Sequence, residues 1–347
     1  KMKNTFYLLA IVIAFFSCKN ENKPAEEQTN PQEINVYTHR HYESDQKLFS
    51  AFEEESGIKV NVINASADEL IQKMVLEGEQ SPADVLITVD AGRLHRAKDK
   101  DLLQPITNPV IDSILPSHLK DKDNNWFALT KRARVIVYAK DRVDPTELSS
   151  YEALVNEEWK DRIVVRSSSN IYNQSLMASI IANDGEEAAK TWAEGMVNNM
   201  ARSPKGNDRD QVKAVAADEA DLAIVNTYYI GKMQNSKDQA ELDAVEKVEV
   251  FFPNQDDRGT HVNVSGIGVA KYAPNKEAAV QFIQYLLSEE AQKVFASSNY
   301  EYPVNPNVEN APILQSWGNF KEDTLNLSKL GELNKKAVIL FDEAGWK

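Results

Sequence analysis

The sequence WFALTKRARVIVY, residues 126–138, predicts a long β-strand, because apolar and β-branched side chains run through it without a glycine or a proline. A strand of this length can pass from one lobe of a protein into another. A second extended stretch, HVNVSGIGVA at residues 261–270, can return the chain to the first lobe. At 347 residues the chain is long enough for two lobes with separate cores, so the two crossings predict a hinge.

The segment before this strand alternates between strands and helices. Short apolar runs at residues 34–38, 58–63 and 85–89 are separated by amphipathic helical patterns, one through Phe52 and one at about 67–77. Such βαβ units are typical of a mainly parallel sheet with helices on its faces. We therefore predict an α/β fold of two lobes, each a mixed sheet flanked by helices, joined by two crossing strands.

The sequence after residue 138 repeats the alternation. The expected elements are a helix near 151–157, a strand at 162–166, a polar loop SSSNIYNQS, helices at about 176–183, from 185 and at 208–217, a strand at 222–226, a loop TYYIG, and a helix at 275–288. We assign residues 34–130 and 267–310 to the first lobe and residues 131–266 and 311–347 to the second, on which the tail at about 325–344 packs.

The amino-terminal segment reads as a processing signal. Two lysines precede an apolar run at residues 6–16 that is too short for a stable membrane span, which predicts a signal peptide at 1–17. Cys18 follows a small residue in a pattern that resembles a bacterial lipobox, and this predicts lipidation. An uncleaved anchor, or secretion with a free thiol, are the alternatives. Residues 18–33 are too polar to fold and predict a flexible tether.

Charge and cysteine content exclude several classes of partner. The net charge of -14, with no massed lysine and arginine, argues against nucleic acid, whose phosphates require a clustered positive surface. Cys18 is the single cysteine of the chain, so an internal disulfide and a thiolate metal cluster are both excluded.

Four tyrosines in predicted loops after short apolar strands suggest a metal site: Tyr42, Tyr172, Tyr228 and Tyr229. Phenolate oxygen is a hard anionic donor that ionises at neutral pH only beside a strong positive charge, which favours ferric iron. His41 adds an imidazole, a frequent iron ligand. Adjacent tyrosines converge on one ion only where the backbone turns, and Gly231 is compatible with a turn.

Three further residues beside these tyrosines could support the site. His39 could lie at the rim of the site, or it could contact the metal ligands without binding the metal itself. Arg40 and Arg166 could offset charge or hold an anion. The alternative for each arginine is an ordinary solvated side chain. The remaining tyrosines that lie in or beside apolar segments or flank Pro303 are expected to be structural: Tyr37, Tyr138, Tyr151, Tyr272, Tyr285, Tyr300 and Tyr302.

Several segments together resemble one protein family, the periplasmic ferric-ion-binding proteins of iron ABC transporters. The resemblance runs from about residue 34 to 347 and rests on RHYESD, SPADVLITVDAGRLHRA, WFALTKRARVIVY, VVRSSSNIYNQSL, GNDRDQVKAV, NTYYIGK and FFPNQDDRGTHVNVSGIGVAK. The chain is most similar to members with one histidine and four tyrosines at the metal, whose motifs fall on His41, Tyr42, Tyr172, Tyr228 and Tyr229. It departs in having His39 where relatives usually carry a small polar residue.

The resemblance implies a two-lobed Venus-flytrap fold that carries Fe(III) to an ABC permease and has no enzymatic activity. With the predicted anchor at Cys18, we expect a monomeric lipoprotein tethered in the periplasm or cell envelope. The alternatives are a flytrap receptor for a polyamine, an anion or a sugar, and a hydrolase that uses residues 167–169 with a histidine. The hydrolase is disfavoured because the sequence has no Gly-x-Ser-x-Gly, His-Glu-x-x-His or phosphate-loop motif.

Overall fold

The computed structural model describes residues 32–347. The predicted signal peptide at 1–17, the predicted lipidation site at Cys18 and most of the predicted tether lie outside the described residues. Within the described part of the chain, no helix has both the length and the apolar character needed to cross a membrane.

The strands form one continuous mixed sheet in the order β2-β1-β3-β8-β4-β6-β5, with β7 and β9 also paired to β4. Pairing is parallel for β1 with β2 and β3 and for β5 with β6, and antiparallel for every pair that involves β4 or β8. This confirms the predicted mixed α/β architecture. The strands are β1 Glu33–Thr38, β2 Lys59–Asn64, β3 Val85–Val89, β4 Phe127–Ala139, β5 Ile163–Val164, β6 Leu222–Asn226, β7 Val248–Phe251, β8 Val262–Val269 and β9 Tyr302–Pro303.

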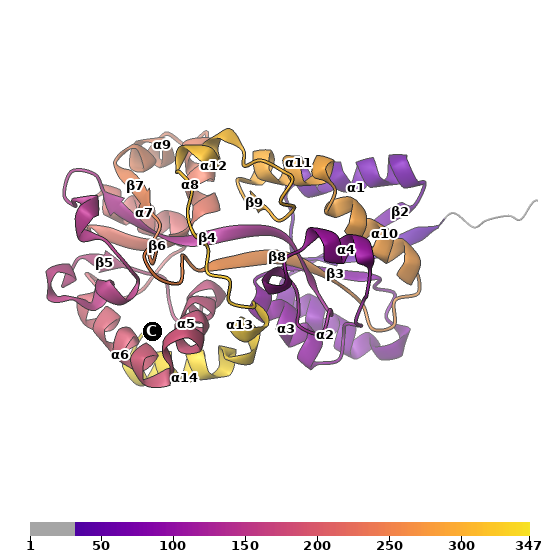
Figure 1. The fold of residues 1–347 in the computed structure, drawn as a ribbon, viewed down its shortest axis with the longest axis horizontal. Helices are drawn as coiled ribbons and strands as arrows, with labels where there is room; N and C mark the ends of the chain where they lie inside the picture. The colour runs from indigo at the N-terminus through magenta and orange to yellow at the C-terminus, as the bar shows by residue number, and fades with distance from the viewer. Residues whose placement is uncertain (1–31) are drawn as a thin grey trace, which may run out of the picture. The chain divides into compact units, whose positions relative to one another are not determined.

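Strands β4 and β8 connect the two parts of the sheet and lie side by side through its middle (Figure 1). The first part of β4, up to Ala133, pairs with β8, and the second part, from Arg134, pairs with β6. On its other edge β8 pairs with β3. We call the strands on the β8 side the first sheet and those on the β6 side the second sheet. The two long strands predicted from the sequence are therefore the elements that join them.

Helices cover both parts of the sheet. They are α1 Glu43–Ser56, α2 Ala67–Glu77, α3 Ala91–Asp99, α4 Pro109–Ile114, α5 Ile171–Asp184, α6 Glu186–Asn199, α7 Asp208–Ala216, α8 Thr227–Gln234, α9 Gln239–Glu246, α10 Lys276–Leu286, α11 Glu289–Asn299, α12 Pro312–Ser316, α13 Ser328–Glu332 and α14 Asn334–Ala344. Helices α1, α10 and α11 pack with one another beside the first sheet, and α7, α8 and α9 pack beside the second. Gly57 ends α1 in the left-handed conformation that glycine adopts at no steric cost.

Local hydrogen bonding explains where the sequence prediction differs from the structure. The helix predicted near 151–157 is two 3-10 turns, Glu152–Val155 and Glu157–Trp159, because Asn156 between them is extended. The helix predicted from about residue 176 begins earlier, at Ile171. Strands β7 and β9 were not predicted because each is short and is completed by pairing with β4.

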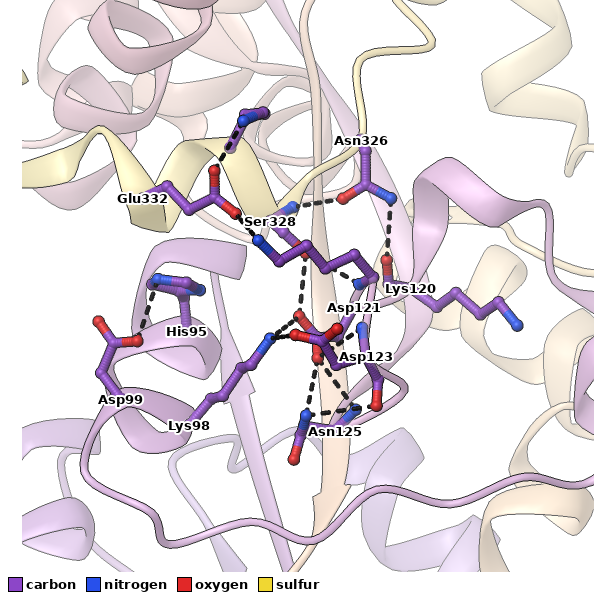
Figure 2. Close-up of polar contacts among 12 residues, drawn as sticks. His95, Lys98, Asp99, Lys120, Asp121, Asp123, Asn125, Asn326, Ser328 and Glu332 are labelled. Carbon is purple, nitrogen blue, oxygen red and sulfur yellow. Dashed lines mark hydrogen bonds and ion pairs between the residues drawn. The ribbon is translucent and has the colours of Figure 1, made fainter.

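The carboxyl-terminal segment contacts both parts of the molecule. Helix α14 packs on α5 and α6, whereas α13 contacts α3 as well as α5. Figure 2 shows how α13 is held: the buried Asp121 carboxylate accepts hydrogen bonds from Ser328 Oγ at 3.0 Å and Lys98 Nζ at 2.9 Å. Asn125 donates to the same carboxylate through its backbone and its side chain. Burial alone would raise the pKa of Asp121, but Lys98 and Asn125 hold it below its ordinary value.

Replacing this carboxylate should destabilise the fold. Asp121→Ala leaves Lys98 with the exposed Asp123 as its remaining carboxylate and leaves the Ser328 and Asn125 donors without their acceptor, so we expect the free energy of unfolding to fall by about 2–3 kcal/mol. Urea denaturation followed by circular dichroism measures the change. Asp123→Ala is the control, because Asp123 also binds Lys98 but its side chain is 59% exposed. Equal losses in the two variants would contradict the role of Asp121.

Candidate metal centre

The four candidate tyrosines lie at the amino-terminal ends of three helices. Tyr42 is the N-cap residue of α1, Tyr172 is the second residue of α5, and Tyr228 and Tyr229 are the second and third residues of α8. The prediction of loops was wrong for the last three. Helix α8 begins directly after β6, and α5 begins early because the Asn170 side chain accepts a hydrogen bond from Tyr172 N at 3.0 Å.

Helix starts suit an anionic donor set. The first backbone N–H groups of a helix have no partner within the helix, and the aligned peptide dipoles make this end positive. The four tyrosines are therefore carried at the positive ends of three helices.

Helix α8 supplies the turn that brings its two tyrosines together. The rings of Tyr228 and Tyr229 lie with their centroids 4.2 Å apart and their planes 31° apart. In a strand, adjacent side chains would point to opposite faces, whereas in a helix they are about 100° apart. The convergence thus comes from helical geometry and does not require a turn at Gly231.

The tyrosine hydroxyls of α5 and α8 are in contact. Tyr228 Oη donates to Tyr172 Oη across 3.3 Å. Tyr42 lies near the same group, since Lys232 Nζ is 3.8 Å from the centre of the Tyr42 ring and 5.3 Å from that of Tyr228. The structure therefore brings together all four predicted tyrosines from three separate stretches of the sequence.

Three of the four tyrosines, Tyr42, Tyr228 and Tyr229, are protonated in the absence of a metal. Burial, with Tyr172 and Asp208 nearby, raises the pKa of Tyr229 to about 12. Burial and the neighbouring tyrosines also raise the pKa of Tyr228 well above its ordinary value. A metal that binds these oxygens must displace their protons. In residues 32–347 no three His, Cys, Asp or Glu side chains form a group suited to a metal, so a metal here would depend on the phenols.

Arg40 is buried beside Tyr42 and is not an ordinary solvated arginine. Its Nε and Nη2 donate to the two oxygens of Asp45 at 2.9 Å each, and its Nη1 donates to Glu301 at 3.1 Å. Its guanidinium lies 4.8 Å from the centre of the Tyr42 ring. Since all three charged residues are buried, Arg40 is held rigidly and supports one face of Tyr42.

A second group of guanidiniums surrounds Tyr172. Those of Arg132, Arg134 and Arg166 lie 5.7, 5.9 and 5.5 Å from the ring centre. Arg166 and Arg134 both donate to the fully buried Asp208, at 3.2 and 2.9 Å. Arg166 is thus also ion-paired rather than solvated, and the group gives the site a positive wall.

Lys232, which the sequence reading did not single out, lies between two of the tyrosines. Its Nζ is 3.8 Å from the centre of the Tyr42 ring and 5.3 Å from that of Tyr228. Burial lowers the pKa of Lys232 to about 8. Its position four residues after Tyr228 on a helix was a detectable signal, because residues i and i+4 share a face. No sequence spacing related Glu301 to the tyrosines, so it could not be predicted as part of the site.

The two candidate histidines differ in environment. His39 is half-buried with its Nδ1 3.4 Å from Thr88 Oγ1, and burial followed by Arg93 lowers its pKa to about 4, so the ring is neutral. His41 is exposed, and its ring lies 5.8 Å from that of Tyr42. His41 is therefore adjacent to the tyrosine group without being buried in it.

Comparison with known proteins now identifies the family. A family model described as bacterial extracellular solute-binding protein matches residues 80–321. The chain belongs to this family. It is 52% identical over 316 residues to "Iron uptake protein A1" of Synechocystis sp., an alignment that covers 91% of this chain and 88% of that protein.

Solved structures of similar proteins share the fold of this solute-binding protein. A Trichodesmium protein described in complex with iron and citrate ligands matches with a TM-score of 0.89 and 50% identity, covering 91% of this chain and all of that one. Apo FutA2 from Synechocystis matches with a TM-score of 0.88 and 47% identity, covering 92% of this chain and 100% of that one. These matches confirm the two-lobed fold and the resemblance stated from the sequence.

The Arg40 ion group makes a testable contribution to stability. Arg40→Met leaves Asp45 and Glu301 buried without their cation, so the free energy of unfolding should fall by about 3–5 kcal/mol. Arg40→Met with Glu301→Gln should recover part of the loss, because one uncompensated charge is gone. Chemical denaturation measures both variants, and a double variant no more stable than Arg40→Met would contradict the pairing.

The same ion group should make stability depend on pH. Burial would raise the pKa of Glu301, but Arg40 and Arg132 hold it below its ordinary value. The stabilisation is therefore present above the ordinary carboxyl pKa and is lost as the pH falls through the lowered value in the folded protein. Repeating the denaturation between neutral and acidic pH should show the difference between wild type and Arg40→Met shrinking as the pH falls.

Proposed function

We propose that this solute-binding protein binds ferric iron through His41, Tyr42, Tyr172, Tyr228 and Tyr229 and delivers it to the permease of an ABC transporter. The observation that carries the proposal is the convergence of four phenols at three helix starts, inside a wall of guanidiniums. No polyamine site would surround its cation with arginines, and a simple anion site would not need four phenols.

The charge of the donor set favours a trivalent ion. Four phenolates and one Fe(III) sum to -1, and a neutral imidazole from His41 leaves this unchanged. With Fe(II) the sum would be -2, buried among the same side chains. The nearby cations Arg132, Arg134, Arg166 and Lys232 can offset a small negative excess. Fe(III) also gains more than Fe(II) from hard anionic oxygen.

The names of the similar proteins support iron as the cargo. The Synechocystis relative is called an iron uptake protein, and the Trichodesmium structure is described with iron and citrate. A protein of Neisseria meningitidis that is 29% identical over 322 residues is called the major ferric iron-binding protein. Ferric citrate is therefore a suitable form in which to supply the metal.

Binding proceeds in two steps in this proposal. Iron first meets Tyr172, Tyr228 and Tyr229, which belong to the second lobe at residues 131–266 and 311–347. Closure then adds His41 and Tyr42 from the first lobe at residues 34–130 and 267–310 and buries the ion. His39, Arg40 and Arg166 would act around the ligands, and the exposed His41 would be drawn in by the metal.

The proposed setting is the periplasm or cell envelope, where the protein would act as a monomer attached to the membrane through a lipid on Cys18. We also propose that it has no enzymatic activity. Ser167 Oγ and Ser169 Oγ are 3.0 Å apart, and Ser167 Oγ also accepts from Ser169 N. These contacts belong to the turn that leads into α5, which supports a structural role for the serines rather than that of a nucleophile.

Colour provides a direct test of the ligand set. Wild-type protein mixed with ferric citrate should turn red or orange through phenolate-to-iron charge transfer. Tyr229→Phe should weaken ferric affinity by at least about tenfold and reduce the band, since one anionic ligand is lost. Tyr272→Phe, at a half-exposed tyrosine away from the site, is the control. Unchanged colour and affinity in Tyr229→Phe would remove Tyr229 from the site.

Proton competition should make iron binding weaken in acid. The pKa of Tyr229 is about 12 without metal, and those of Tyr42 and Tyr228 are also raised. Each phenol that ionises on binding therefore releases one proton and contributes about a tenfold loss of affinity per unit fall in pH. Citrate competition at several pH values, corrected for free Fe(III), measures the slope. A slope near zero would show that phenols are not ionised by the metal.

A further inference from the structure

Helix α8 makes one contact that depends on the absence of a side chain. A Cβ placed on Gly231 would lie 2.6 Å from Tyr300 Cβ and 2.8 Å from Tyr300 Cγ. Real Cβ atoms do not pack this closely, and both partner atoms lie at the rigid base of the tyrosine. Helix α8 therefore approaches Tyr300 to a distance that only glycine permits at this position.

Tyr300 itself is held in an unfavourable conformation. It caps α11 in the left-handed region, with φ of 58° and ψ of 35°. A bulky residue rarely adopts this conformation, and glycine or asparagine is the usual choice at such a helix end. Tyr300 keeps this strained conformation with its side chain packed on α8, which points to a functional role for the contact.

The contact joins elements that belong to different parts of the sheet. Helix α11 packs on α1 and β4 and also contacts α8, whereas α8 packs with α7 and α9 and against β4 and β6 (Figure 1). On α8, Gly231 follows the two tyrosines of the candidate site. Tyr300 is followed by Glu301, which accepts the hydrogen bond from Arg40 at 3.1 Å. Arg40 in turn supports Tyr42.

The neighbouring residues show that Tyr42 lies against α8 close to Tyr300. We call this contact region of α8 with Tyr300 and Tyr42 the seam. Lys232, directly after Gly231, places its Nζ 3.8 Å from the centre of the Tyr42 ring. The distance from α8 to Tyr300 therefore determines how near Tyr228 and Tyr229 come to Tyr42. A shift of α8 by the thickness of one methyl group would separate these donors.

We propose that the contact between Gly231 and Tyr300 is a closure stop, which sets the separation of the α8 tyrosines from Tyr42 in the closed protein. Gly231 and Tyr300 are then positioning residues that do not touch the cargo. The consequence for iron rests on the function proposed above, whereas the stop itself is a property of the metal-free chain.

A double-mutant cycle tests the stop through ferric affinity. Gly231→Ala should push α8 away from Tyr300, weaken ferric affinity by about tenfold or more, and change the charge-transfer band because Tyr42 is displaced. Tyr300→Gly removes the ring and the backbone strain. Gly231→Ala combined with Tyr300→Gly should return the affinity to within about threefold of Tyr300→Gly alone, since the added methyl then has room.

Two controls separate positioning from general damage. Gly195→Ala creates the same close approach in α6, where the new Cβ would lie 2.6 Å from Val155 Cβ, away from the tyrosines. It should lower stability and leave ferric affinity unchanged. Gln234→Ala changes an exposed residue of α8 itself and should alter neither quantity. Full ferric affinity in Gly231→Ala, or no recovery in the double variant, would overturn the proposal.

A metal-free measurement distinguishes failure of the stop from failure of the iron assignment. Spin labels at Glu54→Cys on α1 and Asp243→Cys on α9, in a Cys18→Ser background, report the distance across the seam. Gly231→Ala should lengthen the shortest populated distance, and adding Tyr300→Gly should restore it. That result without any iron binding would support the stop and reject the iron assignment. Iron binding with unchanged label distances would support the iron assignment and reject the stop.

Discussion

The hydrogen-bonded pairing of β4 with β8 is the constraint on which the rest of the molecule depends. β4 is shared between two groups of strands, so one strand fixes the direction of helices on both sides. The helices that follow β1 and β6 begin almost directly at the strand ends. Their first turns therefore lie near the middle of the molecule, where short connections leave little freedom to the side chains they carry.

Electrostatics then decides what the assembled side chains can hold. Burial keeps Tyr228 and Tyr229 protonated when no cation is present, yet the tyrosines also lie beside guanidiniums, of which Arg40 and Arg134 are ion-paired. A monovalent or divalent ion offers too little charge to displace several protons with raised pKa values. A trivalent ion offers more, and the paired arginines limit the negative charge that results. In the function proposed above, the same burial that disfavours free phenolate would favour a trivalent ion over ions of lower charge.

Helix α8 combines two roles that are usually separate. Its first turn carries Tyr228 and Tyr229, and its second turn contacts Tyr300 and Tyr42. Since the eight residues of α8 form one rigid helix, its two tyrosines and its contact with Tyr300 move together. Under the two proposals made above, closure and completion of the ligand set would be one event, which agrees with a protein whose cargo must be both enclosed and released.

The sequence by itself determined the alternation of strands and helices, the two crossing strands and the identity of the four tyrosines. These features follow from local patterns, because periodicity and residue type depend only on near neighbours in the chain. The ligand roles of His41 and of the four tyrosines, and the division into lobes, stay predictions. The tertiary structure decided that Tyr172, Tyr228 and Tyr229 lie in helices, where capping and strand ends set the first residue.

Only the tertiary structure could pair Arg40 with Glu301, which lies 261 residues away, or set Tyr300 against Gly231. The sequence expectation that Tyr300 is structural did not include its contact with the tyrosine-bearing helix. Contacts of this kind depend on where whole elements pack, and no short-range pattern encodes that position. The sequence therefore supplied the four tyrosines, while long-range packing decided their spacing and their charge environment.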